Sequence, residues 1–383
     1  MDAVRVALWA GAATVGALGW SGRLECLPVA LLALVLWRLS RSQIEAFGVA
    51  ASYYGAASVG WIRAASRFFG SETGYSVDAT FVWVGCAALL ALPWGLLWSK
   101  RFAVSVVSRV ARGAALGLIL MLPPLGLVSW CNPWVAGAAM LPGLGYLAFG
   151  LVTGSVFASG PRSWPGWGAL FFLVSAVACD RAEPVADRDW AGVSTRYGRL
   201  SAVSVDAQYD RAVAAGRAAA RVGAHLALFP EGAAGRWTWS RAALWTAQAA
   251  DSGQVLLVGA IEEHAGERRN GLAVIGDGEP WFWPQRLPAP IGMWAPWRSS
   301  HVRSDLMRSS VVHLQGRRVA LLVCFEQFVS WPALQSALEG AEVVLAPANL
   351  WFANGTNLNA VREVTLRTWA SLMGWSVVEA VND

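Results

Sequence analysis

The sequence has few charged residues. Of its 383 residues, 14% are charged and 56% are hydrophobic, and the mean hydropathy is +0.44. A soluble globular protein carries about 25% charged residues, so most of this chain is not built for water. Residues 1–180 are almost entirely apolar or small, whereas residues 181–383 carry Arg, Glu and Asp among short apolar runs. We therefore expect a transmembrane domain over 1–180 and a soluble domain over 181–383.

Cysteine is also scarce, and its five copies are scattered. No Cys-x-x-Cys pair or Cys/His cluster occurs, which argues against a zinc site and against a disulfide framework. We expect no metal and no organic cofactor. Four of the cysteines lie in or beside apolar stretches, where a free thiol behaves as a small hydrophobe. Only Cys324 lies in the polar half of the chain.

The sequence lacks a basic stripe as well. The net charge is +5 and the isoelectric point is near 9.2. The Lys and Arg residues form no run that would follow a phosphate backbone, so direct binding of nucleic acid is not expected. The four histidines are dispersed, and we expect structural or surface roles for them. "GERRNG" (266–271) has the composition of a solvated turn.

Long apolar runs fill the first half. A helix needs about 20 apolar residues to cross a bilayer core. We expect seven spans, at about 4–20, 24–40, 43–63, 79–98, 113–130, 134–157 and 166–180. The second and seventh are the shortest, so counts of six and eight stay open.

Basic residues in the short loops predict the orientation, because cytoplasmic loops collect Lys and Arg. With a cytoplasmic N-terminus, that side would carry Arg5, Arg38, Arg41, Lys100, Arg101, Arg109, Arg112 and Arg162. The opposite side would carry Arg23, Arg63 and Arg67. We therefore expect a multi-pass protein of a bacterial inner membrane with residues 181–383 in the periplasm. An even number of spans would reverse this last expectation.

The second half alternates strand-like and helix-like segments, which predicts an α/β body with sheets covered by helices. The expected strands are 199–207, 225–230, 255–263, 270–276, 317–325, 342–349 and 376–382. The expected helices are 209–224, 241–253, 331–341 and 359–375. Ligands of such folds collect at the carboxyl ends of the strands. Glu231 and Cys324 both fall at such ends.

Cys324 stands in "LLVCFEQF" (321–328), two residues before Glu326. A thiol attacks an acyl carbonyl as the thiolate, so a base has to take its proton. A carboxylate can do so when burial raises its pKa, and Glu231 and Glu326 are the candidates. From these residues alone, a packed core residue is the more common interpretation of such a cysteine, and a place beside a helix N-terminus is an open interpretation of Glu231.

Four segments in order resemble the nitrilase superfamily of carbon–nitrogen hydrolases: "LALFPEGAAG" (226–235), "NGLAVIGDGEPWFWPQRLPAPIGMW" (270–294), "GRRVALLVCFEQF" (316–328) and "APANLWF" (346–352). The layout resembles the apolipoprotein N-acyltransferase branch, in which a multi-span α-helical membrane domain precedes a periplasmic nitrilase-like domain. The resemblance implies an αββα sandwich. It also implies that Glu231 is the general base, Cys324 the nucleophile and Glu326 the adjacent glutamate. Asn349 and Trp351 match an element on the substrate side.

The stretch "WPQRLPAPIGM" (283–293) departs from that pattern. The family's catalytic lysine, which stabilises the oxyanion and the thiolate, falls on Gln285, and the glutamate that follows it falls on Met293. An amide carries no charge, and losing one preorganised oxyanion donor typically costs ~10²–10³ in rate. Arg286, one residue along, is the other cation that could serve.

"APIGMWAPW" (289–297) resembles the conjugal transfer protein TraB family of plasmid transfer systems, which joins membrane spans to a nitrilase-like domain. This resemblance implies a role in conjugal transfer beside other conjugation proteins. It also implies a cysteine thioester mechanism for acyl transfer or amide hydrolysis on a membrane lipid or acylated substrate, with Trp294 near the acyl group or on the membrane surface. Two alternatives stay open. One is a catalytically degenerate membrane component of the transfer apparatus, and the other is a true apolipoprotein N-acyltransferase.

Overall fold

The computed structural model describes residues 3–70, 76–100, 105–158, 189–199, 205–264, 266–299 and 301–383. They form two compact units. Unit 1 comprises Met1–Pro184, Phe328–Leu334 and Gly355–Gly374, and unit 2 comprises Val185–Gln327, Gln335–Asn354 and Trp375–Asp383. The predicted boundary at residue 180 stays a prediction. The two C-terminal segments that belong to unit 1 were not expected from composition, because they are short and lie between strands.

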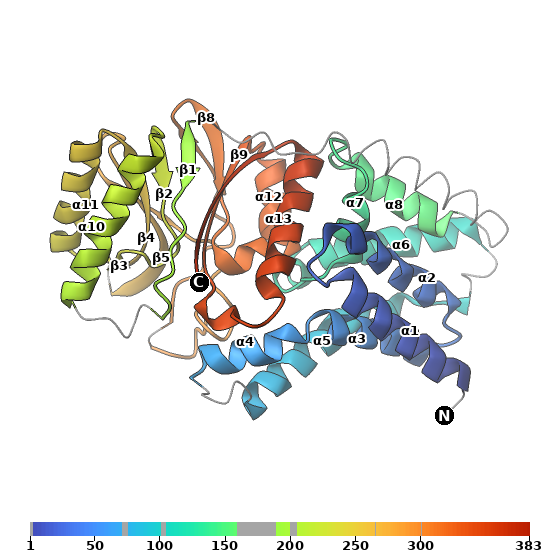
Figure 1. The fold of residues 1–383 in the computed structure, drawn as a ribbon. Helices are drawn as coiled ribbons and strands as arrows, with labels where there is room; N and C mark the ends of the chain where they lie inside the picture. The colour runs from blue at the N-terminus through green and yellow to red at the C-terminus, as the bar shows by residue number, and fades with distance from the viewer. Residues whose placement is uncertain are drawn as a thin grey trace. The chain divides into compact units, whose positions relative to one another are not determined.

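Unit 1 is helical (Figure 1). Its elements are α1 (Ala3–Gly19), η1 (Leu24–Leu31), α2 (Leu32–Leu39), α3 (Gln43–Ala57), α4 (Gly60–Phe68), α5 (Val77–Leu97), α6 (Val106–Met121), η3 (Leu125–Leu127), α7 (Pro133–Ala138), α8 (Leu147–Phe157) and α13 (Leu358–Met373). The late helix α13 is tied in by backbone hydrogen bonds, since the N–H groups of Gly143 and Gly145 donate to its carbonyls at Ser371 and Leu372.

Among the described residues, α5 is the one helix that is long and apolar enough to cross a membrane, while α1 and α8 are apolar but shorter. The continuous spans predicted at 24–40 and 134–157 are broken. Pro28 lies in a 3₁₀ segment that precedes α2, and a non-helical stretch with positive φ at Gly143 and Gly145 separates α7 from α8. The predicted span 166–180 lies outside the described residues. A multi-pass topology therefore stays a prediction.

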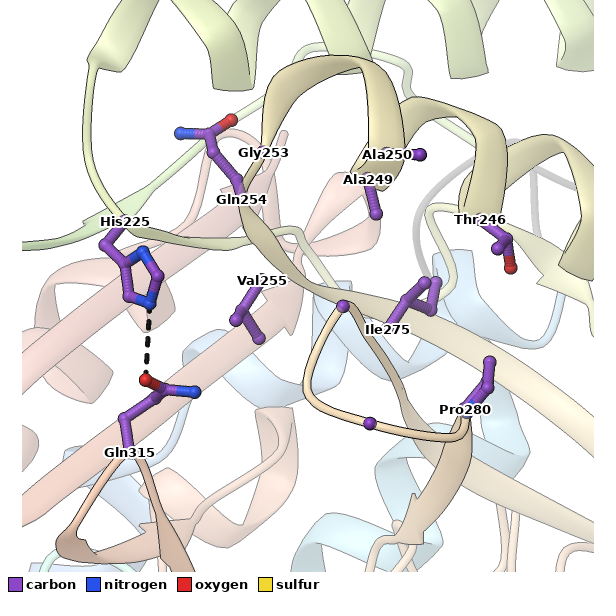
Figure 2. Close-up of a pocket in the computed structure, with 12 residues that line it drawn as sticks. His225, Thr246, Ala249, Ala250, Gly253, Gln254, Val255, Ile275, Pro280 and Gln315 are labelled. Atoms are coloured by element: carbon purple, nitrogen blue, oxygen red, sulfur yellow. Dashed lines mark hydrogen bonds between the residues drawn. The ribbon is translucent and has the colours of Figure 1, made fainter.

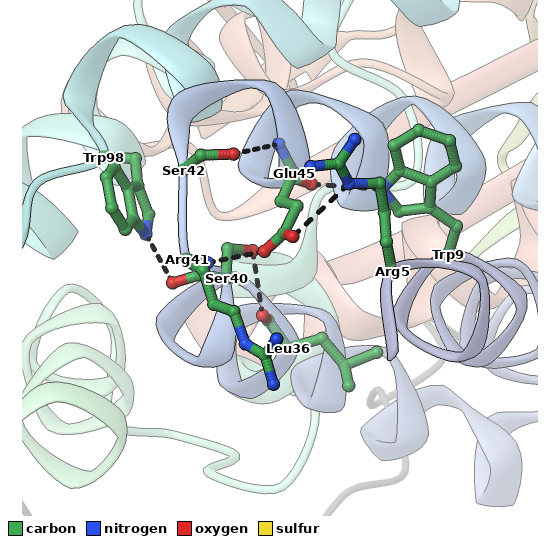
Figure 3. Close-up of polar contacts among 8 residues, drawn as sticks. All are labelled: Arg5, Trp9, Leu36, Ser40, Arg41, Ser42, Glu45 and Trp98. Atoms are coloured by element: carbon green, nitrogen blue, oxygen red, sulfur yellow. Dashed lines mark hydrogen bonds and ion pairs between the residues drawn. The ribbon is translucent and has the colours of Figure 1, made fainter. Parts of the chain in front are cut away.

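A buried carboxylate joins the start of α3 to α1 in unit 1 (Figure 3). The Glu45 carboxylate accepts a hydrogen bond from the backbone N of Arg41 at 2.7 Å and from Nε of Arg5 at 3.4 Å. Its own N–H donates to the N-cap residue Ser42, and its carbonyl accepts from Trp9. A buried carboxylate needs such partners, and an acidic group in the first turn also suits the helix dipole.

Unit 2 contains two sheets (Figure 1). The six-stranded sheet has the order β1-β2-β4-β5-β6, with β3 paired to β4. Its strands are β1 (Trp190–Gly192), β2 (Leu226–Leu228), β3 (Gly235–Arg236), β4 (Val255–His264), β5 (Glu267–Ile275) and β6 (Trp281–Pro284). The four-stranded sheet has the order β10-β9-β8-β7. Its strands are β7 (Val311–Leu314), β8 (Arg317–Leu321), β9 (Val343–Asn349) and β10 (Ser376–Asn382).

The two sheets stack through one apolar core. Leu228 and Leu257 from the first sheet share a buried cluster with Leu321 and Leu345 from the second. Because neighbouring strand residues point to opposite faces, the alternate residue Phe229 lies in a second cluster under the two helices α10 (Val205–Val222) and α11 (Trp239–Ser252). The predicted α/β body with stacked sheets is confirmed. Unit 2 by itself supplies the helix–sheet–sheet layers of an αββα arrangement.

Two element predictions in unit 2 were wrong. Residues 205–207, predicted as part of a strand, open α10, because the Ala-rich helical spacing begins earlier than expected. Residues 200–204 of that predicted strand lie outside the described residues. The strand predicted to run through Cys324 ends at Leu321. The strands β1, β3, β6 and β7 have two to four residues each, too few for a clear alternation.

Candidate functional site

Glu231 and Cys324 each follow the carboxyl end of a strand, one in each sheet. Glu231 follows β2, and Cys324 opens the 3₁₀ turn η5 (Cys324–Gln327) after β8. The backbone of Cys324 has φ +47°, in the left-handed region that non-glycine residues rarely adopt. Such strained residues cluster at active sites, where surrounding contacts hold them. Cys324 is therefore presented on a held turn rather than packed along a strand.

Hydrogen bonds to Glu326 help to fix the conformation of this turn. Its fully buried carboxylate accepts hydrogen bonds from the backbone N–H groups of Arg286 at 3.1 Å, Leu287 at 2.8 Å and Val323 at 2.7 Å. Burial raises the pKa of Glu326, while the nearby Arg286 cation and these N–H groups act in the opposite direction. The contacts of Glu326 thus fix two loops, the one that contains Arg286 and the one that contains Cys324.

Glu231 has different surroundings. Its buried carboxylate accepts a hydrogen bond from Nδ2 of Asn270 at 2.7 Å. The Cys324 thiol and the backbone of Asn349 also lie beside this carboxylate, and the thiol donates to the carbonyl of Asn349 at 3.8 Å. Burial raises the pKa of Glu231, while Asn270, the Cys324 thiol and the Asn349 backbone oppose the rise. A carboxyl with a raised pKa beside a thiol is the arrangement expected of a base and its nucleophile.

Gln285 lies beside this pair in an amide network. Its Nε2 donates to the carbonyls of Leu287 at 3.1 Å and Val323 at 3.0 Å, while its Oε1 accepts from Asn270 at 2.7 Å. An amide nitrogen has two hydrogens, and both are used here. In this arrangement Gln285 has no donor left for an oxyanion. The sequence holds a single lysine, Lys100, which lies in the N-terminal half of the chain.

Arg286 has different hydrogen-bond partners from its neighbour Gln285. Its guanidinium donates to Oε1 of Gln335 at 2.7 Å and to Oγ of Ser336 at 3.3 Å. Burial lowers the pKa of Arg286, and the Glu326 carboxylate opposes this. These contacts tie Arg286 to the end of α12 (Ser330–Leu338). They give it a structural task where the sequence had made it an alternative oxyanion donor.

The predicted substrate-side residues are placed unequally. The carbonyl of Asn349 lies 3.8 Å from the Cys324 sulfur, and its side-chain oxygen accepts from Asn382 at 2.8 Å. Trp351 lies two residues further on, and the exposed Arg199 guanidinium is 5.2 Å from its ring centroid. Trp294 makes its backbone hydrogen bond at 3.0 Å within its own loop, to Ala289, and its place near the acyl group stays a prediction.

The sequence analysis gave Asn270 no role in the site. It counted Asn270-Gly271 both in the turn predicted at 266–271 and in the strand predicted at 270–276, and the strand is confirmed, since both residues lie inside strand β5. Gly271 is required there, because a Cβ would stand 2.1 Å from the carbonyl oxygen of Trp283 on the neighbouring strand. The close approach of β5 and β6 brings the Asn270 side chain between Glu231 and Gln285. A polar residue next to a glycine at the start of the buried, apolar part of the strand was the available signal.

A hollow of about 540 Å³ lies at the opposite ends of the strands (Figure 2). It is lined by residues that precede or open strands, such as His225 and Val255, and by Gln315, whose Oε1 is 3.2 Å from Nε2 of His225. Neither Glu231 nor Cys324 lines it. Across the described ranges, no group of three or more His, Cys, Asp or Glu side chains could hold a metal ion.

Solved structures of low similarity include an amidase of the nitrilase superfamily from Nesterenkonia, 19% identical with a TM-score of 0.38, covering 50% of this chain and 74% of that one. A carbon–nitrogen hydrolase from Helicobacter pylori is 15% identical with a TM-score of 0.40, covering 50% of this chain and 72% of that one. No family model matches the chain.

Two curated relatives match almost end to end. Conjugal transfer protein TraB of Agrobacterium fabrum is 29% identical over 386 residues, covering 96% of this chain and 90% of the relative. A protein of Sinorhizobium fredii named "Probable conjugal transfer protein TraB" is 29% identical over 378 residues, covering 96% of this chain and 95% of the relative. Over nearly its whole length, this chain is therefore similar to proteins that carry the name conjugal transfer protein TraB.

Proposed function

We propose that this chain is a membrane-anchored, nitrilase-like protein of plasmid conjugal transfer, and that it uses Cys324 to form a thioester in acyl transfer or amide hydrolysis. The observation that carries the chemistry is the buried Glu231 carboxylate placed beside the Cys324 thiol, with Cys324 held on a left-handed turn. The similarity to the two TraB proteins supports the biological setting. The proposed location is the inner membrane, with unit 2 in the periplasm.

In the first half-reaction, Glu231 takes the thiol proton while the Cys324 sulfur attacks the acyl carbonyl carbon of the donor. A carbon–sulfur bond forms, and the carbonyl π electrons move to oxygen. When the tetrahedral intermediate collapses, the bond from the acyl carbon to the leaving group breaks. Protonated Glu231 returns its proton to that leaving group. The products are a thioester on Cys324 and a free amine or alcohol.

In the second half-reaction, an amine or water attacks the thioester carbon. Glu231 now takes a proton from the attacking nucleophile, and the carbon–sulfur bond breaks. The sulfur leaves as a thiolate and recovers the proton from Glu231. An amine acceptor gives an amide, whereas water gives a carboxylic acid. Glu231 therefore acts alternately as base and acid, which requires a pKa above that of an ordinary carboxyl.

The oxyanion in this proposal relies on backbone N–H groups around the Cys324 turn. The two hydrogens of the Gln285 amide already donate to carbonyls, and the Arg286 guanidinium contacts α12. A site without the family's lysine should be slower, since one preorganised donor is worth ~10²–10³ in rate. Low turnover is thus part of the proposal.

The absence of the family's lysine and the occupied donors of Gln285 favour a second candidate, a catalytically degenerate component of the transfer apparatus. In that case the Glu231–Cys324 pair would be a remnant, and the chain would serve transfer through its fold. A true apolipoprotein N-acyltransferase is a third candidate, and neither curated relative carries that name.

Plasmid transfer from donor cells that carry Cys324→Ala tests the proposal. The catalytic account expects transfer to fall to the level of a deletion of the whole gene, with wild-type amounts of full-length protein in the membrane. Cys131→Ala, a change at a buried thiol of unit 1, is the matched control and should retain transfer. Undiminished transfer by Cys324→Ala would establish the degenerate candidate.

A further inference from the structure

Asn270 stands between the two halves of the site. Its Nδ2 donates one hydrogen to Oε1 of Glu231 and the other to Oε1 of Gln285, both at 2.7 Å. The link to Gln285 is double, because the backbone N of Gln285 donates to the carbonyl of Asn270 at 2.7 Å. Asn270 and Gln285 are both buried. Neither side-chain amide can therefore rotate without breaking hydrogen bonds that water would not replace.

Gln285 continues the connection to the nucleophile. Its Nε2 donates at 3.0 Å to the carbonyl of Val323, the residue immediately before Cys324. The same carbonyl accepts from the N–H of Glu326 at 3.0 Å, which closes the turn. The orientation of the Val323 peptide decides the backbone angles of Cys324, and these angles are strained. Gln285 thus holds the strained turn from one side.

We propose that Asn270 and Gln285 form a neutral amide relay that orients the Glu231 carboxylate and holds the Cys324 turn, so that both act as positioning residues in place of a lysine. This inference rests on the proposed function of Glu231 and Cys324. The polarity of the relay is fixed at both ends. Nδ2 of Asn270 faces a carboxylate that only accepts, and Nε2 of Gln285 faces two carbonyls that only accept.

The relay also fixes which oxygen of Glu231 does the chemistry. Asn270 donates to Oε1, which leaves Oε2 as the less occupied oxygen, and we assign Oε2 to the sulfur on that ground. A carboxylate that is free to rotate would lose this division. A hydrogen bond to the charged form favours that form. Asn270 therefore keeps Glu231 ionised to lower pH than burial alone would allow.

The test measures how fast iodoacetamide alkylates Cys324 across a pH series in the full-length protein, with the Cys324 peptide quantified by mass spectrometry. This readout needs no substrate. The wild-type rate should fall as the pH drops and Glu231 takes up a proton. This falling part of the pH profile is the acid limb. Asn270→Leu removes the donor to the carboxylate, so the limb should move to higher pH by about one unit, which makes alkylation on the limb about tenfold slower at a given pH.

Gln285→Lys should move the limb the other way. The ammonium keeps donors for the carbonyls of Leu287 and Val323, and its charge favours both the carboxylate and the thiolate. We expect a shift of about one unit to lower pH and, at a given pH on the limb, alkylation about tenfold faster than in wild type. Opposite shifts from two neighbouring substitutions would not result from a general loss of structure.

Gln254→Leu is the matched control. Gln254 is a buried amide whose Nε2 donates to the carbonyl of Ala224, before β2 begins, so it lies at the far end of that strand from Glu231. Its loss should lower thermal stability without moving the Cys324 limb. Unmoved limbs in both Asn270→Leu and Gln285→Lys, with thermal unfolding still cooperative, would overturn the relay. So would shifts of the same sign.

Failure of the relay and failure of the proposed function give different results. If Cys324→Ala abolishes plasmid transfer while the two limbs stay in place, the proposed function stands and the relay falls. If Cys324→Ala leaves transfer unchanged while the limbs move in opposite directions, the relay stands as a structural property of a site that transfer does not use.

Discussion

Two glutamates flank Cys324, and their surroundings differ in kind. Glu326 is held by three backbone N–H groups and lies near Arg286, so its oxygens are occupied by permanent partners. Glu231 meets a side-chain amide, a backbone group and the thiol itself. Both carboxyls are buried, and burial raises the pKa of both. The difference shows that burial alone does not make a base, because a base also needs a partner with a proton to give.

The largest expected effect comes from Glu326→Gln. The amide cannot accept from all three N–H groups, and the buried Arg286 guanidinium loses one of the two carboxylates that favour its charge, keeping Glu339. Leaving a buried N–H donor without its acceptor costs about 1–3 kcal/mol, and the lost charge near Arg286 adds to this. Thermal or denaturant unfolding of the purified protein measures the loss. Wild-type stability in this variant would remove the anchoring role from Glu326.

The identical change on the other side, Glu231→Gln, should separate stability from chemistry. The amide oxygen can still accept from Asn270, so the free energy of unfolding near pH 7 should change by less than about 1 kcal/mol. Turnover should fall by about 10²–10⁴, because the general base is gone. Unfolding curves and single-turnover acylation of the same preparation give both numbers. Equal losses of stability in Glu231→Gln and Glu326→Gln would erase the contrast between the two carboxyls.

The pH dependence of stability sharpens the contrast further. Since folding raises the pKa of Glu231 above the ordinary 4.5, the folded state binds this proton more tightly than the unfolded state does. The contribution therefore favours folding at low pH. It is lost as the pH rises from about 4.5 through the raised value, by at most about 1.4 kcal/mol per pH unit.

Glu231→Gln cannot titrate and should not show this loss. Relative to wild type, the variant should gain stability as the pH rises through that window and then level off. Unfolding measured at a series of pH values on both proteins tests the sign. A difference that stays flat, or that runs the other way, would mean that Glu231 is not held at a raised pKa.

The smallest effect on stability is expected at the exposed contact between Arg199 and Trp351, which is called the rim of the site. Arg199→Ala removes an exposed cation from the face of Trp351, a contact worth about 0.5–1 kcal/mol. Unfolding should register a loss in that range, while alkylation of Cys324 should keep its rate and its pH limb. A large change in the limb would extend the site to the rim and would give Arg199 a role beside Glu231.

The sequence predicted the α/β half well where patterns were long. Helix α11 and its left-handed C-cap at Gly253, and the strands β4, β9 and β10, lie close to their predicted positions. The pairing of Glu231 with Cys324 came from the resemblance to the nitrilase superfamily, because the two residues follow strands of different sheets and no rule about one sheet edge brings them together. Neither Gln285 nor Arg286 could be assigned, since both follow β6 in a loop where strand alternation no longer applies.

The membrane half was harder to predict for a physical reason. A continuous apolar run is compatible with one spanning helix or with two broken segments, and composition does not separate them. Backbone at Gly143 and Gly145 finds its hydrogen-bond partners on α13, more than two hundred residues later in the chain. No local pattern could reveal that α13 belongs to unit 1.

The central claim is that Glu231 takes the proton of Cys324. The most direct measurement is the rate of Cys324 alkylation by iodoacetamide at pH 7 in full-length wild type, Glu231→Gln and Glu326→Gln, each compared with Cys86 in the same sample. The account predicts that Glu231→Gln alkylates Cys324 at least tenfold more slowly than wild type, with folding and the Cys86 rate preserved. Equal rates in wild type and Glu231→Gln would contradict it.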